Sequence, residues 1–354
     1  MNSQKIKPQT LKGFRDFLPE TASKRDWLIA RLKTVFKKFG FDPLESPALE
    51  YAETLLGKYG DEADKLLYLF KDRGDRQVGL RYDQTVPLAR IVSQYQNLPK
   101  PFKRYQIQPV WRAENTQKGR YREFLQCDID IVGTKDILAD FEVVDCVLTA
   151  FKSLGFKNIT ILLNDRANFF GIDNRFINSL DKLPKIGEEK VIEELVKKGL
   201  GKDEAKKLIR EIKEKPETEN IIQLTKLLEA KGYQKGVDFL YQPTLARGLD
   251  YYTGIIYEVV SKDYPVGSLG GGGRYDNLIK LFTNQDVPSV GFAFGFDRIV
   301  EAMEVLSLLP QQKTETKVLV AIFSKELIDQ SLKITIFFVK TTSIQKFILT
   351  HLPN

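Results

Sequence analysis

The sequence of 354 residues predicts an α+β protein in which antiparallel strands and helices follow one another along the chain. Residues 104–133 alternate apolar and polar side chains, break at a basic loop that contains Gly119, and then alternate again. This pattern is typical of two antiparallel strands joined by a hairpin loop. Residues 66–85 repeat it around a turn at 71–75. Residues 166–240 are instead rich in Lys and Glu at helical spacing, which predicts a helical domain inserted into the main one.

The first two elements are a helix and a strand that contains two prolines. Apolar residues in 21–39 recur at helical spacing, and Gly40 ends the run. Pro43 and Pro47 exclude a helix interior in 41–50 and favour an edge or interface strand. This segment can serve either core packing or a contact between two copies of the chain.

The later elements include a glycine-rich stretch and an arginine at the start of a helix. Periodicity predicts helices at 138–154, 188–199, 203–214 and 219–231, and strands at 158–164 and 240–260. Residues 267–281 contain four consecutive glycines, which let a backbone pass close to a ligand or another strand. They match neither a P-loop nor a dinucleotide fingerprint, because no Gly-Lys-Ser/Thr follows and no βαβ unit surrounds them. Arg298 opens a predicted helix, as a phosphate-binding arginine or as a surface residue.

The C-terminal stretch begins as a further α/β domain. Residues 317–323 are typical of a strand, and we expect 324–332 to form a helix. A domain of ordinary size needs roughly 100 residues, and no acidic residue follows Asp329. We therefore expect an incomplete domain at 317–354, with a tail that is truncated or frame-shifted.

The composition points to a protein of the cytoplasm. A hydrophobic content of 42% is ordinary for a globular protein, and no apolar run is long enough to cross a bilayer. The N-terminus lacks the apolar core of a secretory signal. Cys127 and Cys146 do not make a disulfide framework, and His351 is the only histidine, so we expect no membrane association and no Cys/His metal site.

The net charge of +7 lies entirely in the first part of the chain. Residues 1–130 contain 24 Lys and Arg against 17 Asp and Glu, whereas the remaining residues hold 30 of each. A local positive field attracts phosphates of nucleotides or nucleic acid. The alternative is that a mildly basic surface only keeps the protein in solution.

The hairpin at 104–133 carries cations and hydrogen-bond acceptors together. Arg112 and Glu114 lie on its first strand, and Gln126, Asp128 and Asp130 lie on its second. This arrangement suits a ligand with phosphates at one end and an amine at the other, although a solvated charged hairpin is an equal alternative. Asp83 and Thr85, at a predicted strand-to-helix junction, either point at a ligand or cap the helix.

Several segments resemble the histidyl-tRNA synthetase family of class II aminoacyl-tRNA synthetases. Three resemble the motifs that the whole class shares: Pro47 after a helix, Arg112-x-Glu114 with Arg120-x-x-x-Phe124, and 291–298 ending in Arg298. Residues 247–252 (RGLDYY) and 272–276 (GGRYD) resemble the signatures that bind histidine in this family, and 80–90 and 126–130 fit it as well. The similarity runs from about Lys12 to Ser331.

The resemblance implies a class II antiparallel sheet flanked by helices, in a catalytic domain formed by residues 1–165 and 241–310. Residues 166–240 would be the inserted helical domain, and 317–354 the remnant of an anticodon-binding domain. The implied homodimer forms through the region around Pro47. The implied activity is that of a histidine–tRNA ligase, which uses ATP with Mg²⁺ to activate L-histidine and then transfers it to tRNA(His).

The resemblance also implies a role for each matching residue. Arg112, Arg247 and Arg298 would be catalytic cations around the phosphates, and the ATP site would comprise Arg112, Glu114, Arg120, Phe124 and Arg298. The histidine site would comprise Asp83, Thr85, Arg112, Gln126, Asp130, Arg247, Tyr251, Tyr252 and Tyr275. Gln117 would contact the tRNA acceptor end. Asn115 replaces an arginine of the family pattern, which weakens that last assignment, and Asp130 stands where many bacterial members have glutamate.

Two other functions fit the same segments. One is the histidine-sensing regulatory subunit of ATP phosphoribosyltransferase, which shares the catalytic fold and lacks the anticodon-binding domain. The inserted domain at 166–240 and the intact Arg112, Arg247 and Arg298 argue against it. The other is a truncated paralogue that binds histidine without charging tRNA. For the shortened chain we expect adenylate formation to survive and tRNA charging to weaken.

Overall fold

The computed structural model describes residues 6–58, 64–116, 121–247, 251–311, 318–340 and 345–348. The chain divides into two units. The larger comprises Met1–Arg15 and Ile29–Leu308, and the smaller comprises Asp16–Leu28 and Leu309–Asn354. Helix α1 (Pro19–Lys38) contributes residues to both.

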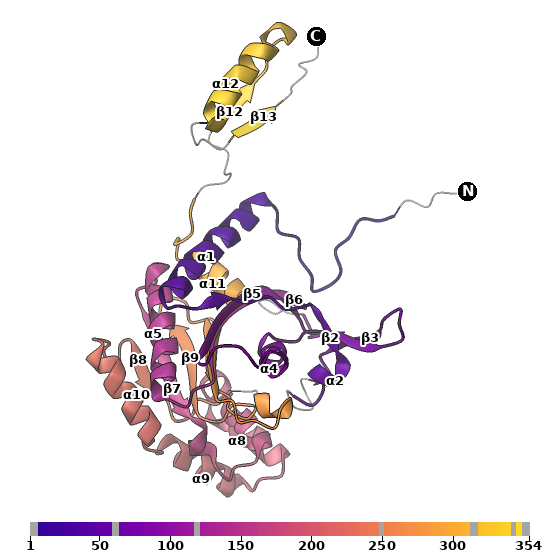
Figure 1. The fold of residues 1–354 in the computed structure, drawn as a ribbon. Coiled ribbons are helices and arrows are strands. Elements are labelled where there is room, and N and C mark those ends of the chain that lie inside the picture. Colours follow the sequence, from indigo (N-terminus) through magenta and orange to yellow (C-terminus); the bar gives the residue numbers. More distant parts are fainter. Residues whose placement is uncertain are drawn as a thin grey trace. The chain divides into compact units, whose positions relative to one another are not determined.

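An eight-stranded sheet forms the centre of the larger unit (Figure 1). Its strands, in spatial order, are β1 (Asp42–Pro43), β5 (Phe102–Trp111), β6 (Glu123–Val132), β11 (Ser289–Phe294), β10 (Gly270–Arg274), β9 (Ile255–Ser261), β7 (Ile159–Asp165) and β8 (Phe239–Tyr241). The six strands from β5 to β7 pair antiparallel, and the short edge strands β1 and β8 pair parallel to their neighbours. The prediction of an antiparallel sheet flanked by helices is confirmed.

The central strand β6 separates apolar from polar side chains. Cys127, Ile129 and Ile131 are fully buried on one face, where helix α5 (Ile137–Ser153) contacts β6, β7 and β11. Polar side chains occupy the alternate positions, because successive residues of a strand point to opposite faces. The apolar face therefore holds the sheet to α5, and the polar face is left for other contacts.

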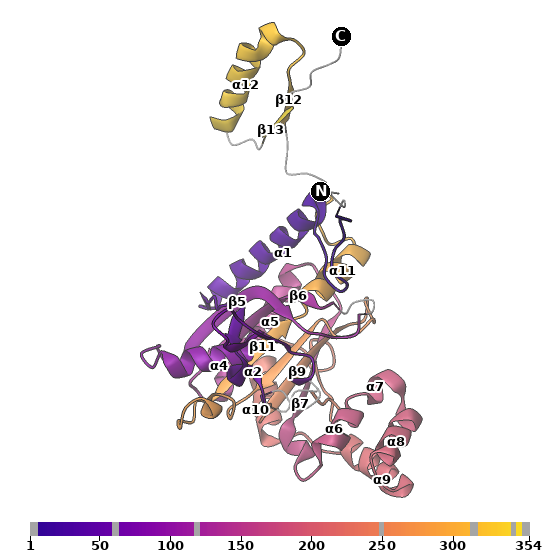
Figure 2. The same ribbon diagram turned by 90° about the vertical axis from the view of Figure 1, so that its right-hand side faces the viewer.

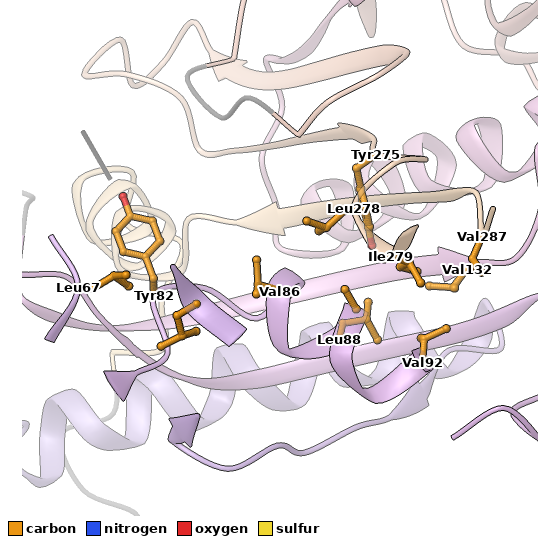
Figure 3. Close-up of a cluster of buried hydrophobic side chains, with 12 residues drawn as sticks. Leu67, Tyr82, Val86, Leu88, Val92, Val132, Tyr275, Leu278, Ile279 and Val287 are labelled. Atoms are coloured by element: carbon orange, nitrogen blue, oxygen red, sulfur yellow. The ribbon is translucent and has the colours of Figure 1, made fainter. Parts of the chain in front are cut away.

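Helix α4 (Thr85–Gln94) lies inside the curve of β5 and β6 (Figure 1). Its apolar residues Val86, Leu88 and Val92 pack with Val132 of β6 and with Ile279 of the short helix η2 (Ile279–Leu281) (Figure 3). This packing fixes the N-terminus of α4 close to the polar face of the sheet.

A separate three-stranded antiparallel sheet precedes α4. It consists of β2 (Leu49–Tyr51), β4 (Gln77–Leu80) and β3 (Tyr68–Lys71), with helix α2 (Ala52–Leu55) after β2. Several large apolar side chains of its outer strands are exposed: Leu49, Tyr51, Leu69 and Phe70. The predicted proline-containing strand is thus divided into β1, at the edge of the large sheet, and β2.

The Lys/Glu-rich stretch forms helices between β7 and β8. They are η1 (Arg166–Phe169), α6 (Asn174–Leu180), α7 (Leu183–Ile186), α8 (Glu188–Lys197), α9 (Lys202–Lys213) and α10 (Glu219–Ala230). Helices α6 to α9 lie together, away from the central sheet (Figure 2). They share a buried core that includes Leu180, Leu195 and Ile209. The predicted helices at 188–199, 203–214 and 219–231 are confirmed within two residues at each end.

The larger unit also contains helix α11 (Phe296–Val305), which directly follows β11. In the smaller unit β12 (Val318–Ala321) pairs parallel with β13 (Gln345–Ile348), and η3 (Lys325–Leu327) leads into α12 (Ile328–Lys340). The predicted helix at 324–332 was too short at its end and began too early. The helix continues through the mostly apolar residues 334–339. A short, mostly apolar run does not show whether it is helical or extended, so the sequence pattern could not predict this extension.

Candidate active site

A cavity of about 500 Å³ opens on the polar face of β6. Every predicted site residue that the structure describes lines it: Asp83, Thr85, Arg112, Glu114, Phe124, Gln126, Asp130, Arg247, Tyr251, Tyr252, Tyr275 and Arg298. Two predicted residues, Gln117 and Arg120, lie outside the described residues. Segments from five separate parts of the sequence therefore meet in one place.

One part of the cavity is rich in buried carboxylates. Asp130 Oδ2 lies 2.7 Å from Arg104 Nη2, and Arg104 is completely buried. The hydroxyl of Tyr275 donates to the other oxygen of Asp130. Burial raises the pKa of Asp130, while the nearby Arg104 guanidinium opposes the rise. Asp130 is thus a well-held acceptor that is already in contact with one phenol and one cation.

The Asp130 side chain lies against the neighbouring strand β11, which is possible only because that strand has a glycine opposite it. Gly291 of β11 lies opposite Asp130 of β6. A Cβ at position 291 would lie 2.0 Å from Asp130 Oδ1 and 2.6 Å from its Cγ. Real side chains do not approach so closely, so glycine at 291 makes the room that this carboxylate occupies.

The N-terminus of α4 is tied to the hairpin beside these carboxylates. The Asp83 carboxylate accepts a hydrogen bond from the Val86 amide at 3.0 Å, so it does cap the helix. The Gln84 side-chain amide donates to the carbonyls of Gln108 and Gln126, on β5 and β6. Asp83 therefore combines helix capping with a position in the cavity wall, and Thr85, the first residue of α4, lines the cavity beside it.

A buried arginine connects the proline-containing segment to the same hairpin. The Arg81 guanidinium donates to the carbonyls of Ser46, Pro47 and Pro109, at 2.6, 3.2 and 2.8 Å. It also donates to Gln108 Oε1 at 3.1 Å. Arg81 is only 2% exposed, so these bonds satisfy a cation that has no access to water.

Arg112 lies against two aromatic rings. Its guanidinium carbon is 4.3 Å from the ring centre of Tyr82 and 5.0 Å from that of Phe124. Its Nε donates to the Tyr82 carbonyl at 3.2 Å. Cation–π contacts of this kind hold a guanidinium plane in one orientation. Arg112 is therefore preorganised at the start of the hairpin.

Asp297 and Arg298, at the N-terminus of α11, each contact a different segment of the chain. Arg298 Nη1 donates to the Ser268 carbonyl at 2.7 Å. Its neighbour Asp297 pairs with Arg15 at 3.1 Å, and the Arg15 guanidinium carbon is 3.2 Å from the ring centre of Tyr121. The start of the chain thus contacts both the helix and the hairpin.

Arg247 lies against the backbone of the glycine-rich strand. Its Nη1 is 3.3 Å from Glu258 Oε2, and its guanidinium is 6.0 Å from the ring centre of Tyr252. A Cβ on Gly271 would lie 1.9 Å from Arg247 Nη1. The four glycines of β10 had been predicted to allow a close backbone approach, and here the group that approaches is an arginine of the same chain.

The arrangement along β6 suits an extended ligand. Phe124 and Asp130 are six residues apart on β6, which corresponds to about 20 Å along a strand. Arg112 lies at the Phe124 position, and the buried carboxylates lie toward Asp130. The arginine at one end can bind a phosphate, and the carboxylates at the other end can bind an amine. The site therefore suits a ligand that carries both groups.

Several residues of the cavity were missed by the sequence reasoning. Asp128, Asp181 and Glu258 also line it, and Arg104 supports it from beneath. The alternation in this strand did place Asp128 beside Gln126 and Asp130, but no role in the site was predicted for it. No sequence signal marks Asp181, which only the packing of the inserted helices brings to the cavity.

No group of three or more His, Cys, Asp and Glu side chains is placed to hold a metal ion in the described part of the chain. No helix among the described residues is both long and apolar enough to cross a membrane.

The order of the strands, with the three motif segments on β5–β6, around Pro47 and on β11–α11, defines a class II aminoacyl-tRNA synthetase fold. The family model of histidyl-tRNA synthetase matches residues 13–172 and 172–299. A histidine–tRNA ligase of Rhodopirellula baltica is 41% identical in an alignment that covers 93% of this chain and 82% of that protein. The chain belongs to the histidyl-tRNA synthetase family.

Solved structures agree with this assignment. The crystal structure of a histidyl-tRNA synthetase from a Nostoc species has a TM-score of 0.82 and is 27% identical, covering 99% of this chain and 88% of that one. An ATP phosphoribosyltransferase regulatory subunit/histidyl-tRNA synthetase from Bacillus halodurans has a TM-score of 0.79 and 22% identity, covering 99% and 95%. The second likeness concerns the fold alone.

Proposed function

We propose that this chain is a histidine–tRNA ligase, which activates L-histidine with ATP and transfers it to tRNA(His). The observation that carries the proposal is the single cavity in which all described signature residues meet. Arginines from three separate segments line it, together with the buried acceptors Gln126 and Asp130 of β6. A histidine carboxylate oxygen attacks the α-phosphorus of ATP, the bond to the β-phosphate breaks, and pyrophosphate leaves. A ribose hydroxyl of the tRNA then attacks the carbonyl carbon, and AMP leaves.

The chain's own cations stabilise the first step. Negative charge builds on the phosphate oxygens in the transition state, and fixed guanidinium groups lower its energy. We assign this role to Arg112 and Arg247 at the α-phosphate and to Arg298 at the γ-phosphate. Mg²⁺ enters with ATP as part of the substrate.

The remaining assignments concern adenine and histidine. Glu114 contacts adenine and Phe124 stacks on it, while Asp83, Thr85 and Gln126 hold the substrate ammonium. Asp130 and Tyr252 bind the imidazole, and Tyr251 and Tyr275 complete the pocket. A pocket that pairs both ring nitrogens rejects analogues that lack them by several orders of magnitude.

We also propose a homodimer that forms through the region around Pro47. The exposed Tyr51, Leu69 and Phe70 on the neighbouring three-stranded sheet support it, because such side chains are usually covered in an assembly. We further propose that 1–165 with 241–310 is the catalytic domain and 166–240 an inserted helical domain. The cytoplasm, where its tRNA would be charged, is the proposed location.

The decisive experiment is histidine-dependent exchange of pyrophosphate into ATP. We expect exchange with the purified protein, and an at least 100-fold loss in Arg247→Ala, since one preorganised donor is worth 10²–10³ in rate. Arg175→Ala is the matched control, because Arg175 is an exposed arginine outside the cavity, paired with Asp173. Histidine binding without any exchange would refute ligase activity and favour a histidine-sensing subunit.

A further inference from the structure

Asp128 is a buried carboxylate of the cavity to which the proposed reaction gives no role. It lies on β6 between Gln126 and Asp130, on the same face of the strand, and lines the cavity. It is 2% exposed, and Gln126 is 7% exposed. A carboxylate this deep inside a protein requires a partner.

The contacts of Asp128 fix the orientation of Gln126. The Gln126 Nε2 donates to Asp128 Oδ2 at 2.7 Å, so the amide oxygen points the other way. Neither Gln126 Oε1 nor Asp128 Oδ1 has a hydrogen-bond partner among the described residues. Buried acceptors without donors are costly, and two of them facing one cavity suit a ligand with several N–H donors.

The charges around Asp128 do not neutralise it. Arg104 Nη2 is 3.9 Å from Asp128 Oδ2 but 2.7 Å from Asp130 Oδ2, so this cation mainly balances Asp130. The other ionisable groups whose charges act on Asp128 or respond to it are Arg81, Asp83, Cys127, Tyr252 and Tyr275. Asp83 and Asp130 thus add like charge beside Asp128, and the short ion pair of Arg104 is made with Asp130 rather than with Asp128.

Burial and the neighbouring charges together set the protonation of Asp128. Burial raises the pKa of Asp128 to about 8, with Arg104 opposing the rise and Asp130 adding to it. Below that pH the carboxyl of the free protein is therefore mostly protonated. A bound cation beside it would favour the ionised form and expel the proton to solvent.

We propose that Asp128 is a specificity-determining residue for the ammonium group of the substrate: it orients the Gln126 amide and becomes the ammonium's counter-ion by releasing a proton. The inference rests on the proposed function, in that the substrate is an amino acid bound at this end of the cavity. It adds that the binding of the substrate releases a proton. Binding of the ammonium form expels one proton from the Asp128 carboxyl, so histidine binds more tightly as the pH rises toward 8.

The test is calorimetric titration of L-histidine at pH 7 in two buffers of different ionisation enthalpy, which counts the protons released. We expect the wild type to release close to one proton more than Asp128→Asn. Between pH 6 and 8 its Kd should fall by up to tenfold per pH unit relative to that of the variant. Asparagine keeps the acceptor for Gln126 and removes only the charge. The KM for ATP in pyrophosphate exchange should stay within twofold.

A ligand comparison in the wild type alone avoids any dependence on the folding of the variant. Imidazolepropionate lacks the ammonium, so it should bind without the additional proton release. Equal proton counts for this ligand and histidine, after correction for each ligand's own titration, would overturn the proposal for Asp128 and leave the ligase function intact. Failure of the wild type to bind histidine at all would overturn both.

Discussion

Replacing Gly271 by alanine tests whether Arg247 has to lie against strand β10. The added Cβ would lie 1.9 Å from Arg247 Nη1 and 2.6 Å from its Cζ. Non-bonded heavy atoms pack at about 3.5 Å, so the guanidinium has to retreat by about 1.5 Å. A displacement of about 1 Å in a positioned group costs about 10²-fold in rate. We therefore expect histidine-dependent pyrophosphate exchange to fall about 100-fold, or about 2.7 kcal/mol in transition-state stabilisation.

A double-mutant cycle shows whether this loss acts through Arg247. Exchange is measured for Gly271→Ala, Arg247→Ala and the double variant, with Gly201→Ala as a control outside the cavity. In the double variant the guanidinium is gone and the tightest remaining neighbour is the Tyr257 carbonyl, at 2.9 Å from the Cβ. The double variant should therefore be close to Arg247→Ala, with a coupling of about 2 kcal/mol. A folded Gly271→Ala variant that keeps a third of the activity would refute this role of Arg247. An equal loss of activity from Gly271→Ala with and without Arg247 would refute it as well.

Two further predictions concern the acidic part of the cavity. In Gly291→Ala the new Cβ would lie 2.0 Å from Asp130 Oδ1, so the histidine KM should rise about 100-fold while the ATP KM stays within twofold. Exchange at varied concentrations of each substrate measures both, and an equal rise in the two values would contradict the prediction. For Asp128→Asn without histidine, unfolding by urea should show a stability that depends less on pH than in the wild type. The folded Asp128 pKa of about 8 lies above its unfolded value near 4, so the native state holds an extra proton in that window. As the pH rises from about 4 to about 8, the free energy of unfolding of the wild type should thus fall by up to ~1.4 kcal/mol per pH unit relative to the variant. Parallel plots of stability against pH for the two proteins would exclude a raised pKa of Asp128.

Local patterns in the sequence were sufficient for most of the elements. The amphipathic spacing in 21–39 and 138–154 predicted α1 and α5 to within two residues, because apolar residues at helical spacing form the buried face of each helix. The alternation in 104–133 predicted β5 and β6, but β5 ends at Trp111. The prediction that Arg112 and Glu114 lie on the first strand was therefore wrong, because both residues follow it in irregular backbone at the start of the hairpin loop. The sheet order could not be predicted from residues alone, since the partners β6 and β11 are joined only by tertiary packing.

Recognisable motifs predicted the residues that line the cavity, but not the buried residues that hold them in place. Family membership, and with it the prediction of a histidine–tRNA ligase, is confirmed by the relatives. The individual roles of Arg112, Arg247 and Arg298 stay predictions. Arg104 could not be assigned from the sequence, because a charged residue on a strand is ordinarily exposed. Only the structure shows that it is fully buried beside Asp130.

The pairing of β6 with β11 has a consequence for the synthesis of the protein. The β5–β6 hairpin is local and can form as soon as it leaves the ribosome, but Asp130 has to wait for Gly291, about 160 residues later. At ordinary translation rates this interval is roughly 8–30 s. During it, the free edge of β6 is open to pairing with other chains. The part of the cavity around Asp130 therefore cannot be completed until β11 has been synthesised, and correct folding requires that the edge of β6 stays unpaired until then.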